Sequence, residues 1–461
     1  MHDRTPTDRE VVLLALPALG ALIAEPLYVL GDTAIIGHLG TLQLAGLALG
    51  GLLLSELFGF CTFLEYGTTA RAVRLYGAGR QREALDVGVQ ATWLALVLGL
   101  VAVAGVELAA GPAVRLLGGG ATPAAAEGVR WIRVAALGAP FVLAAAAGQG
   151  WLRAVQDTRT PLLVIAAANL FSIGVSALLV LGLGVGIVGS AIANVAAQLL
   201  SGGVLVALLA RRGVPLRPSW RRMRGQLGAA RDLSLRTLAF FAAFTVATGV
   251  AARIGDVTLA AQQVGVQLWT FAALLLDSTA IAAQALIGRL LGAGSLAGAS
   301  ALARRLLVAG ALLGSGIGLL LAAGHAAVPR IFTGDPRVLA EVGVLWPWLV
   351  AMMPAAGVLF ALDGVFFGAG DLRFMRDVSV LAAVAGFIPL TVATRIEGWG
   401  LNGLWLGLSA FLWIRLAVGA ARWRGGRWLV AGVRTVDEAD RPGGRSDRLD
   451  LLHVPDDPGA F

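Results

Sequence analysis

The chain has no lysine, one cysteine and four histidines, and charged residues make up only 14% of its 461 positions. The single cysteine, Cys61, excludes an internal disulfide, and the four histidines lie too far apart in the sequence to suggest a metal cluster. The sequence therefore indicates no metal site and no cofactor.

Apolar residues dominate instead, since the AVILMFWYC types supply 57% of the chain and the mean hydropathy is +0.80. No soluble domain has this composition. The net charge of +8 comes from arginines, most of which cluster in short segments between apolar runs. Because that distribution is typical of a membrane protein, a nucleic-acid partner is the weaker interpretation of the basic charge, and we expect none.

Twelve apolar runs are long enough to cross a bilayer, which takes about 20 helical residues. Only helices and closed barrels satisfy their backbone groups in lipid, so the sequence predicts an all-α integral membrane protein with twelve transmembrane helices. The predicted spans are 11–36, 43–70, 84–110, 128–152, 161–182, 186–210, 234–253, 259–288, 302–325, 341–368, 378–395 and 399–421.

Arginines cluster after the even-numbered spans and are sparse at the opposite connections. The positive-inside rule places arginine-rich connections in the cytoplasm. We therefore expect a multi-pass protein of the cell inner (plasma) membrane with both termini cytoplasmic.

An internal repeat divides the chain, because Gly40–Gly50 (GTLQLAGLALG) aligns with Gly255–Gly265 (GDVTLAAQQVG) at an offset of 215 residues. Six spans in each half return the chain to the side where it began, which predicts two parallel-repeat lobes around a central cleft. The predicted domains are an N-terminal six-helix lobe at 1–211, a basic cytoplasmic linker at 212–231, a C-terminal six-helix lobe at 232–422 and a polar, disordered tail at 423–461.

Asp32 is the most informative residue, because it places a carboxylate in the first predicted span. A charge at the centre of a membrane helix costs roughly 2.5–3.5 kcal/mol or more and usually faces a cavity. Glu25, Tyr28 and Asp32 share one helical face, so the phenol can donate to the carboxylate. The three residues are the predicted cation or proton coupling site, which requires contact with water. The alternative is a carboxylate satisfied by bonds between helices, without a role in transport.

Two prolines, Pro17 and Pro26, lie in the same predicted span. Each removes a backbone donor and can bend the helix. We expect both to be helix-bending positions.

The repeat also shows that three acids belong to one lobe only, since Asp32, Asp277 and Asp363 align with Ala247, Thr62 and Gln149. An acid needed merely to hold a lobe together is expected in both, so a functional role is favoured. Asp277 and Gln284 lie on one helical stripe, and with Asp363 they are predicted to line the cleft.

Ion pairs are the alternative for these acids. Asp277 or Asp363 would then pair with Arg236, which neutralises both partners in lipid. Glu65 is similarly either a group of the cavity or a partner of Arg71.

Four motifs in order resemble MATE (multidrug and toxic compound extrusion) transporters across residues 9–422: GDTAIIGHLG, GTTARAVRLYGAG, LRAVQDTRTP and GLGVGIVGSAIAN. Glu25-Pro26-Leu27 and Asp363-Gly364 resemble its DinF-like branch. The resemblance implies a secondary active transporter, not an enzyme, that exports organic, often cationic, compounds against H+ or Na+ by alternating access. It also implies a coupling role for bending near Pro17. We expect the partners to be a small organic substrate, the coupling ion and the bilayer, and the protein to be a monomer.

The chain departs from the family pattern in span five, where many relatives carry a second acid and this sequence has Ser172 and Ser176. A polar pocket with Asn169 and Asn194 is still predicted beside Asp32. Hard cations prefer several oxygen ligands, so a single carboxylate favours H+ over Na+.

Two other functions fit a polytopic membrane protein. A lipid-linked precursor flippase has similar lobes but commonly has extra spans and an arginine-rich cleft, whereas the cleft predicted here is acidic. A membrane-embedded transferase would require a paired-aspartate or histidine motif in a large loop, and the sequence has neither.

Overall fold

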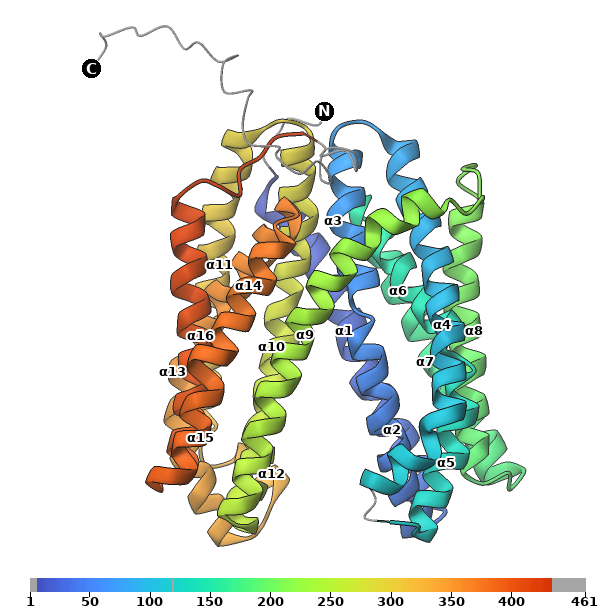
Figure 1. Cartoon of the computed structure of the whole chain (residues 1–461), viewed down its shortest axis with the longest axis vertical. Coiled ribbons are helices and arrows are strands. Elements are labelled where there is room, and N and C mark those ends of the chain that lie inside the picture. The colour runs from blue at the N-terminus through green and yellow to red at the C-terminus, as the bar shows by residue number, and fades with distance from the viewer. Residues whose placement is uncertain (1–5, 118–119, 433–461) are drawn as a thin grey trace, which may run out of the picture.

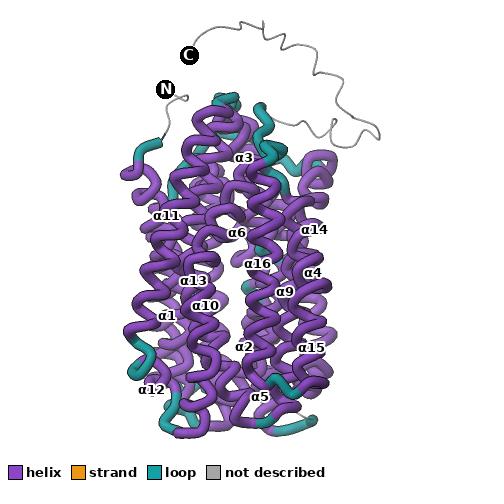
Figure 2. Tube along the Cα trace, turned by 90° about the vertical axis from the view of Figure 1, so that its left-hand side faces the viewer, coloured by secondary structure: helices purple, strands orange, loops and turns teal. Residues whose placement is uncertain are grey.

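The computed structural model describes residues 6–117 and 120–432, and every regular element within these ranges is a helix (Figures 1 and 2). Eleven segments are long and apolar enough to cross a membrane, and the α5–α6 pair, bent by 53°, makes a twelfth. The predicted fold class, an all-α membrane protein with twelve spans, is confirmed.

The first half of the chain forms one lobe, in which α2 and α3 make a single span interrupted at Cys61 and Thr62. A capping box starts α1, because Thr7 Oγ1 accepts from the Glu10 backbone N–H while Glu10 accepts from Thr7. The elements are α1 (Asp8–Gly37), α2 (Thr41–Phe60), α3 (Phe63–Gly77), α4 (Gln81–Leu117), α5 (Pro123–Ala136), α6 (Ala139–Ala154), α7 (Arg159–Ala177), the π-helical turn η1 (Leu178–Gly182) and α8 (Ile187–Ala210).

The second half forms the other lobe, whose central helices α10 and α13 are long and continuous. Asp335 caps α13, where the Arg337 side chain and backbone N–H hold the pKa of the Asp335 carboxyl below its ordinary value. The elements are α9 (Trp220–Ile254), α10 (Asp256–Gly292), α11 (Leu296–Ala323), α12 (Val328–Phe332), α13 (Pro336–Ala369), α14 (Leu372–Ala382), the π-helical turn η2 (Ala383–Phe387), α15 (Ile388–Glu397) and α16 (Gly400–Arg424).

The basic linker predicted at 212–231 is non-helical only as far as Ser219, because α9 already begins at Trp220. Its non-helical part is held along α4. Gln90 accepts from the Ser219 backbone N–H at 2.8 Å, and Trp93 Nε1 donates to the Leu216 carbonyl at 2.7 Å.

The tail predicted from residue 423 is ordered at its start, since α16 ends at Arg424 and residues 425–432 pack against the bundle. Trp428 is 2% exposed, and its indole N–H donates to the Trp423 carbonyl. The apolar indole therefore keeps this segment on the protein. The predicted disorder of residues 433–461 lies outside the described residues.

The lobes meet at the end of the molecule where α1 begins and α16 ends, here called the terminus end, and diverge toward the opposite end (Figure 1). A Cβ on Gly77 would lie 2.1 Å from the Arg289 carbonyl oxygen, and one on Gly292 would lie 2.2 Å from that of Arg74. The backbones of α3 and α10 are therefore in direct contact there, which larger residues would prevent.

Candidate functional site

Asp32 lies inside the N-terminal lobe, bound by hydroxyl groups from two other helices. Ser176 of α7 donates to Oδ1 at 2.8 Å, and Ser190 of α8 donates to Oδ2 at 2.6 Å. Trp131 of α5 donates its indole N–H to Ser190 at 3.3 Å. Within residues 6–117 and 120–432, no arginine forms an ion pair with Asp32. Only neutral donors therefore satisfy this carboxylate.

Tyr28 is also buried, but its hydroxyl accepts a hydrogen bond from Asn194 at 2.7 Å. Gln198 in turn donates to the Asn194 side-chain oxygen at 2.6 Å. The predicted donation from Tyr28 to Asp32 is absent from the described hydrogen bonds. Ser172, which is 1% exposed, lies against Tyr28 one turn before Ser176.

Glu25 marks the outer limit of this polar row, because it is exposed whereas Asp32 is only 4% exposed. Asn169 of α7 donates to the Ala24 carbonyl at 3.0 Å and lies beside Glu25. Polar side chains thus lead from the buried carboxylate to the protein surface. The structure brings all the predicted residues of the first span, with their partners on α7 and α8, into one group.

The two predicted helix-bending residues, Pro17 and Pro26, both lie inside α1, which is continuous through them. Each occupies an interior position where a backbone donor is missing. The corresponding helix of the other lobe, α9, has no internal proline.

Asp363 has the environment that the ion-pair alternative predicts. Arg236 and Arg415 both donate to its Oδ2, at 2.8 and 2.5 Å. The Arg415 guanidinium lies 4.9 Å from the centre of the Phe240 ring, and that of Arg236 lies 5.0 Å from it, which adds cation–π contacts. With two cations on one carboxylate, this position does not present a free acid to a cavity.

Asp277 contacts the other lobe, because Tyr66 of α3 donates to its Oδ2 at 2.6 Å. Gln284 donates to the Tyr66 carbonyl at 3.0 Å, and the Tyr66 ring stacks on Phe367 at 4.9 Å. These two predicted cleft residues therefore form part of the contact between the lobes.

Glu65 pairs with Arg153 of α6 instead of the predicted Arg71. Positions 65 and 71 are six residues apart and point to different faces of α3. Gly150 allows α6 close approach, since its Cβ would lie 2.7 Å from the Glu65 carbonyl oxygen. The partner thus comes from the neighbouring helix.

Sequence reasoning missed several partners of the predicted residues. Ser190 is one turn before the predicted Asn194, so the shared helical face was a usable signal. Tyr66, Arg153 and Arg415 approach from other helices, and nothing in their own sequence spacing indicates those contacts.

The family model for MatE matches residues 17–178 and 233–392, one segment in each lobe. The chain belongs to the MATE transporter family. It is 33% identical over 446 residues to DNA damage-inducible protein F of Escherichia coli (strain K12), covering 93% of this chain and 95% of that relative. The predicted resemblance to the DinF-like branch of MATE transporters is therefore confirmed, and with it the expectation that the protein is a transporter and not an enzyme.

More distant relatives support the same family. The probable multidrug resistance protein NorM of Thermotoga maritima is 20% identical, with 93% of this chain and 94% of that protein covered. Among solved structures, a MATE in the bent conformation superposes with a TM-score of 0.84 at 20% identity, covering 93% and 96% of the two chains. An outward-facing multidrug resistance MATE transporter superposes with a TM-score of 0.82 at 20% identity, covering 91% and 95%.

Proposed function

We propose that this MATE transporter exports organic, often cationic, compounds in exchange for protons, with Asp32 as the coupling carboxylate. The observation that carries the proposal is the binding of Asp32 by two serine hydroxyls without an arginine. A hydroxyl can donate to a carboxylate and can also accept from a protonated carboxyl group. The site is therefore suited to both protonation states, whereas a salt bridge would favour only the ionised one.

The same surroundings argue for protons over sodium. Hard cations bind several oxygen ligands, commonly including more than one carboxylate. Here the two hydroxyls nearest to the acid direct their hydrogens toward it, and a second acid is missing from α7. Multidrug substrates are proposed from the family and from relatives described as multidrug resistance proteins.

In the proposed cycle, Asp32 is ionised while substrate occupies the space between the lobes. A proton entering by the polar row from Glu25 neutralises it, and the loss of charge allows α1 to bend at its prolines and displace the substrate. An entering charge gains about 2.3 kcal/mol per 100 mV of membrane potential. Two lobes with alternative contacts then give alternating access.

The arrangement of the lobes fits one state of that cycle. If the arginine-rich end is cytoplasmic, as we propose for an inner-membrane monomer with both termini inside, the backbone contact at Gly77 and Gly292 closes the cytoplasmic side. The divergence at the opposite end then corresponds to an outward-facing state (Figure 1).

Transport by the purified protein in proteoliposomes tests the proposal. An imposed proton gradient should drive a fluorescent organic cation across the membrane in the direction opposite to the protons. A sodium gradient at fixed pH should drive no movement of the cation. Sodium-driven transport without a proton gradient would refute proton coupling. Asp32→Asn protein that still transports normally would refute the assignment of this residue.

A further inference from the structure

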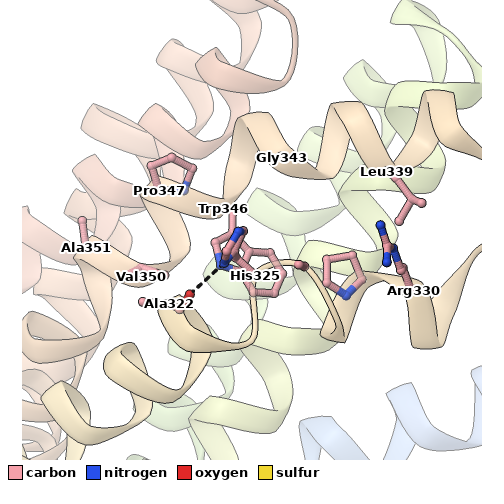
Figure 3. Close-up of a pocket in the computed structure, with 11 residues that line it drawn as sticks. Ala322, His325, Arg330, Leu339, Gly343, Trp346, Pro347, Val350 and Ala351 are labelled. Carbon is pink, nitrogen blue, oxygen red and sulfur yellow. Dashed lines mark hydrogen bonds between the residues drawn. The ribbon is translucent and has the colours of Figure 1, made fainter.

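A pocket of about 660 Å³ lies in the C-terminal lobe at the end opposite the termini, between α13 and the segment joining the end of α11 to α12. Figure 3 shows Pro347, Gly343 and Leu339 along one wall, with His325 and Arg330 on the facing wall. Its volume is within the roughly 300–1,000 Å³ that small-molecule sites occupy. It is separate from the Asp32 site, which lies in the other lobe.

The ionisable groups of this pocket are both basic. His325 and Arg330 line it together with apolar side chains and Trp346, and no acid is among the lining residues. In the described ranges, Arg330 has no hydrogen-bond or ion-pair partner, and His325 bonds only through Nδ1, to the Ala322 carbonyl at 3.2 Å. Both side chains are exposed, so the two basic groups lie at the open side of the pocket and are accessible to an anion.

The two nearest acids in sequence are already engaged. Asp335 pairs with Arg337 at 3.0 Å, and Glu341 accepts from Thr258 at 3.2 Å. No acid of the lining or of the adjacent sequence pairs with these basic groups, which leaves them available to an anion from outside the chain.

The surroundings indicate the depth of the pocket in the membrane. Trp399, at the start of α16, is 43% exposed, and Trp348 donates its indole N–H to Asn402 near the same helix end at 3.0 Å. Exposed tryptophan is typical of the membrane interface. Ile331 and Phe332, next to Arg330, are 79% and 45% exposed, as expected for a surface that faces lipid. The cationic groups thus lie near the boundary between headgroups and acyl chains.

We propose that this pocket binds an anionic phospholipid, with the phosphate at Arg330 and His325 and the upper part of an acyl chain along the apolar wall of α13. A phosphate group accepts charge-assisted hydrogen bonds from a guanidinium, and the attached acyl chain matches the apolar part of the lining. The surrounding bilayer delivers this ligand at high local concentration. The site does not depend on which compound the transporter exports.

Native mass spectrometry of the full-length protein tests this binding with dioleoylphosphatidylglycerol as the probe and dioleoylphosphatidylcholine as the zwitterionic comparison. Wild-type protein should retain phosphatidylglycerol at least about tenfold more strongly than phosphatidylcholine, a difference of about 1.4 kcal/mol. Arg330→Gln should reduce retention to the level of phosphatidylcholine. Arg395→Gln is the matched control, because Arg395 is an exposed arginine at the same end that does not line the pocket.

Filling the pocket while keeping its charges provides an independent variant. A Cβ on Gly343 meets nothing within 4 Å, so Gly343→Leu places a side chain in the pocket without a clash, and phosphatidylglycerol retention should fall. Gly316→Leu on α11 is the control, since its Cβ is equally unobstructed and lies outside the pocket. Equal retention of the two lipids by wild-type protein would overturn the proposal, as would unchanged retention in both Arg330→Gln and Gly343→Leu.

Discussion

The buried acids of the two lobes have different kinds of hydrogen-bond partner. Asp32 of the N-terminal lobe is held by two serines, whereas Asp363 of the C-terminal lobe is held by two arginines. A guanidinium can only donate hydrogen bonds, so it pairs with an ionised carboxylate, whereas a hydroxyl can donate to a carboxylate or accept from a protonated carboxyl group. The repeat therefore supplies similar scaffolds, and the polar residues that differ between the lobes decide which kind of partner holds each acid.

The lobes also differ in the continuity of their central helices. In the N-terminal lobe, α2 and α3 are interrupted, α5 and α6 are bent by 53°, and α1 contains two prolines. In the C-terminal lobe, α10 runs for 37 residues without a break. It packs closely on α13, because a Cβ on Gly364 of α13 would lie 2.4 Å from the carbonyl oxygen of Ala280 in α10. The central helices of the C-terminal lobe are therefore continuous and closely packed, although α13 also contains two internal prolines, Pro347 and Pro354.

The largest effect is expected from Asp32→Asn, which should reduce proton-driven efflux in proteoliposomes to background. The amide can still bond to both serines, so the unfolding free energy in an SDS titration should change by no more than about 1 kcal/mol. Efflux that persists in folded Asp32→Asn protein would show that Asp32 is not the coupling acid. The proposed functional difference between the two lobes would then be wrong.

Asp363→Asn should act on stability instead. It leaves Arg236 and Arg415 without a counter-charge in a buried site, and breaking such a pair costs about 3–5 kcal/mol. The loss should appear in the SDS titration, and adding Arg415→Gln should recover part of it. A stable Asp363→Asn protein without transport would instead make Asp363 the coupling acid.

Ser190→Ala sharpens the role assigned to the hydroxyls. It removes the 2.6 Å hydrogen bond to Asp32, and a bond to a charged group contributes about 1.5–3 kcal/mol. Efflux should fall markedly without being abolished, because Ser176 still binds the carboxylate. Ser201→Ala, also on α8, is the control, because Ser201 is buried and donates to the Gln198 carbonyl of its own helix. Equal losses in the two variants would contradict a specific role for Ser190.

The smallest effect is expected from Tyr66→Phe at the contact between the lobes. It removes the hydrogen bond to Asp277 but keeps the stacking on Phe367, and Arg153 and Arg236 still attract that carboxylate. The unfolding free energy should fall by about 1 kcal/mol while efflux continues. Complete loss of efflux would show that Asp277 takes part in coupling, which would give the C-terminal lobe an active acid as well.

Much of the fold could be predicted from the sequence, because span length and the repeat follow from local composition and spacing. The bend between α5 and α6 and the early start of α9 at Trp220 could not, since both depend on packing and side-chain contacts with other helices. At the site, the grouping of Asp32 with Ser176 and Asn194 followed from the family resemblance, because these residues lie on three different helices, α1, α7 and α8. The choice between a cavity and an ion pair for Asp363 required the distance to Arg415, 52 positions away.

The ordered start of the tail has a practical consequence for experiments. Arg74 of α3 donates both to the Ala369 carbonyl at the end of α13 and to the Val430 carbonyl, so the segment after α16 is fastened to the opposite lobe. A truncation before Trp428 would remove this attachment together with the buried indole. Shortened versions of the protein should therefore keep residues through at least Val430.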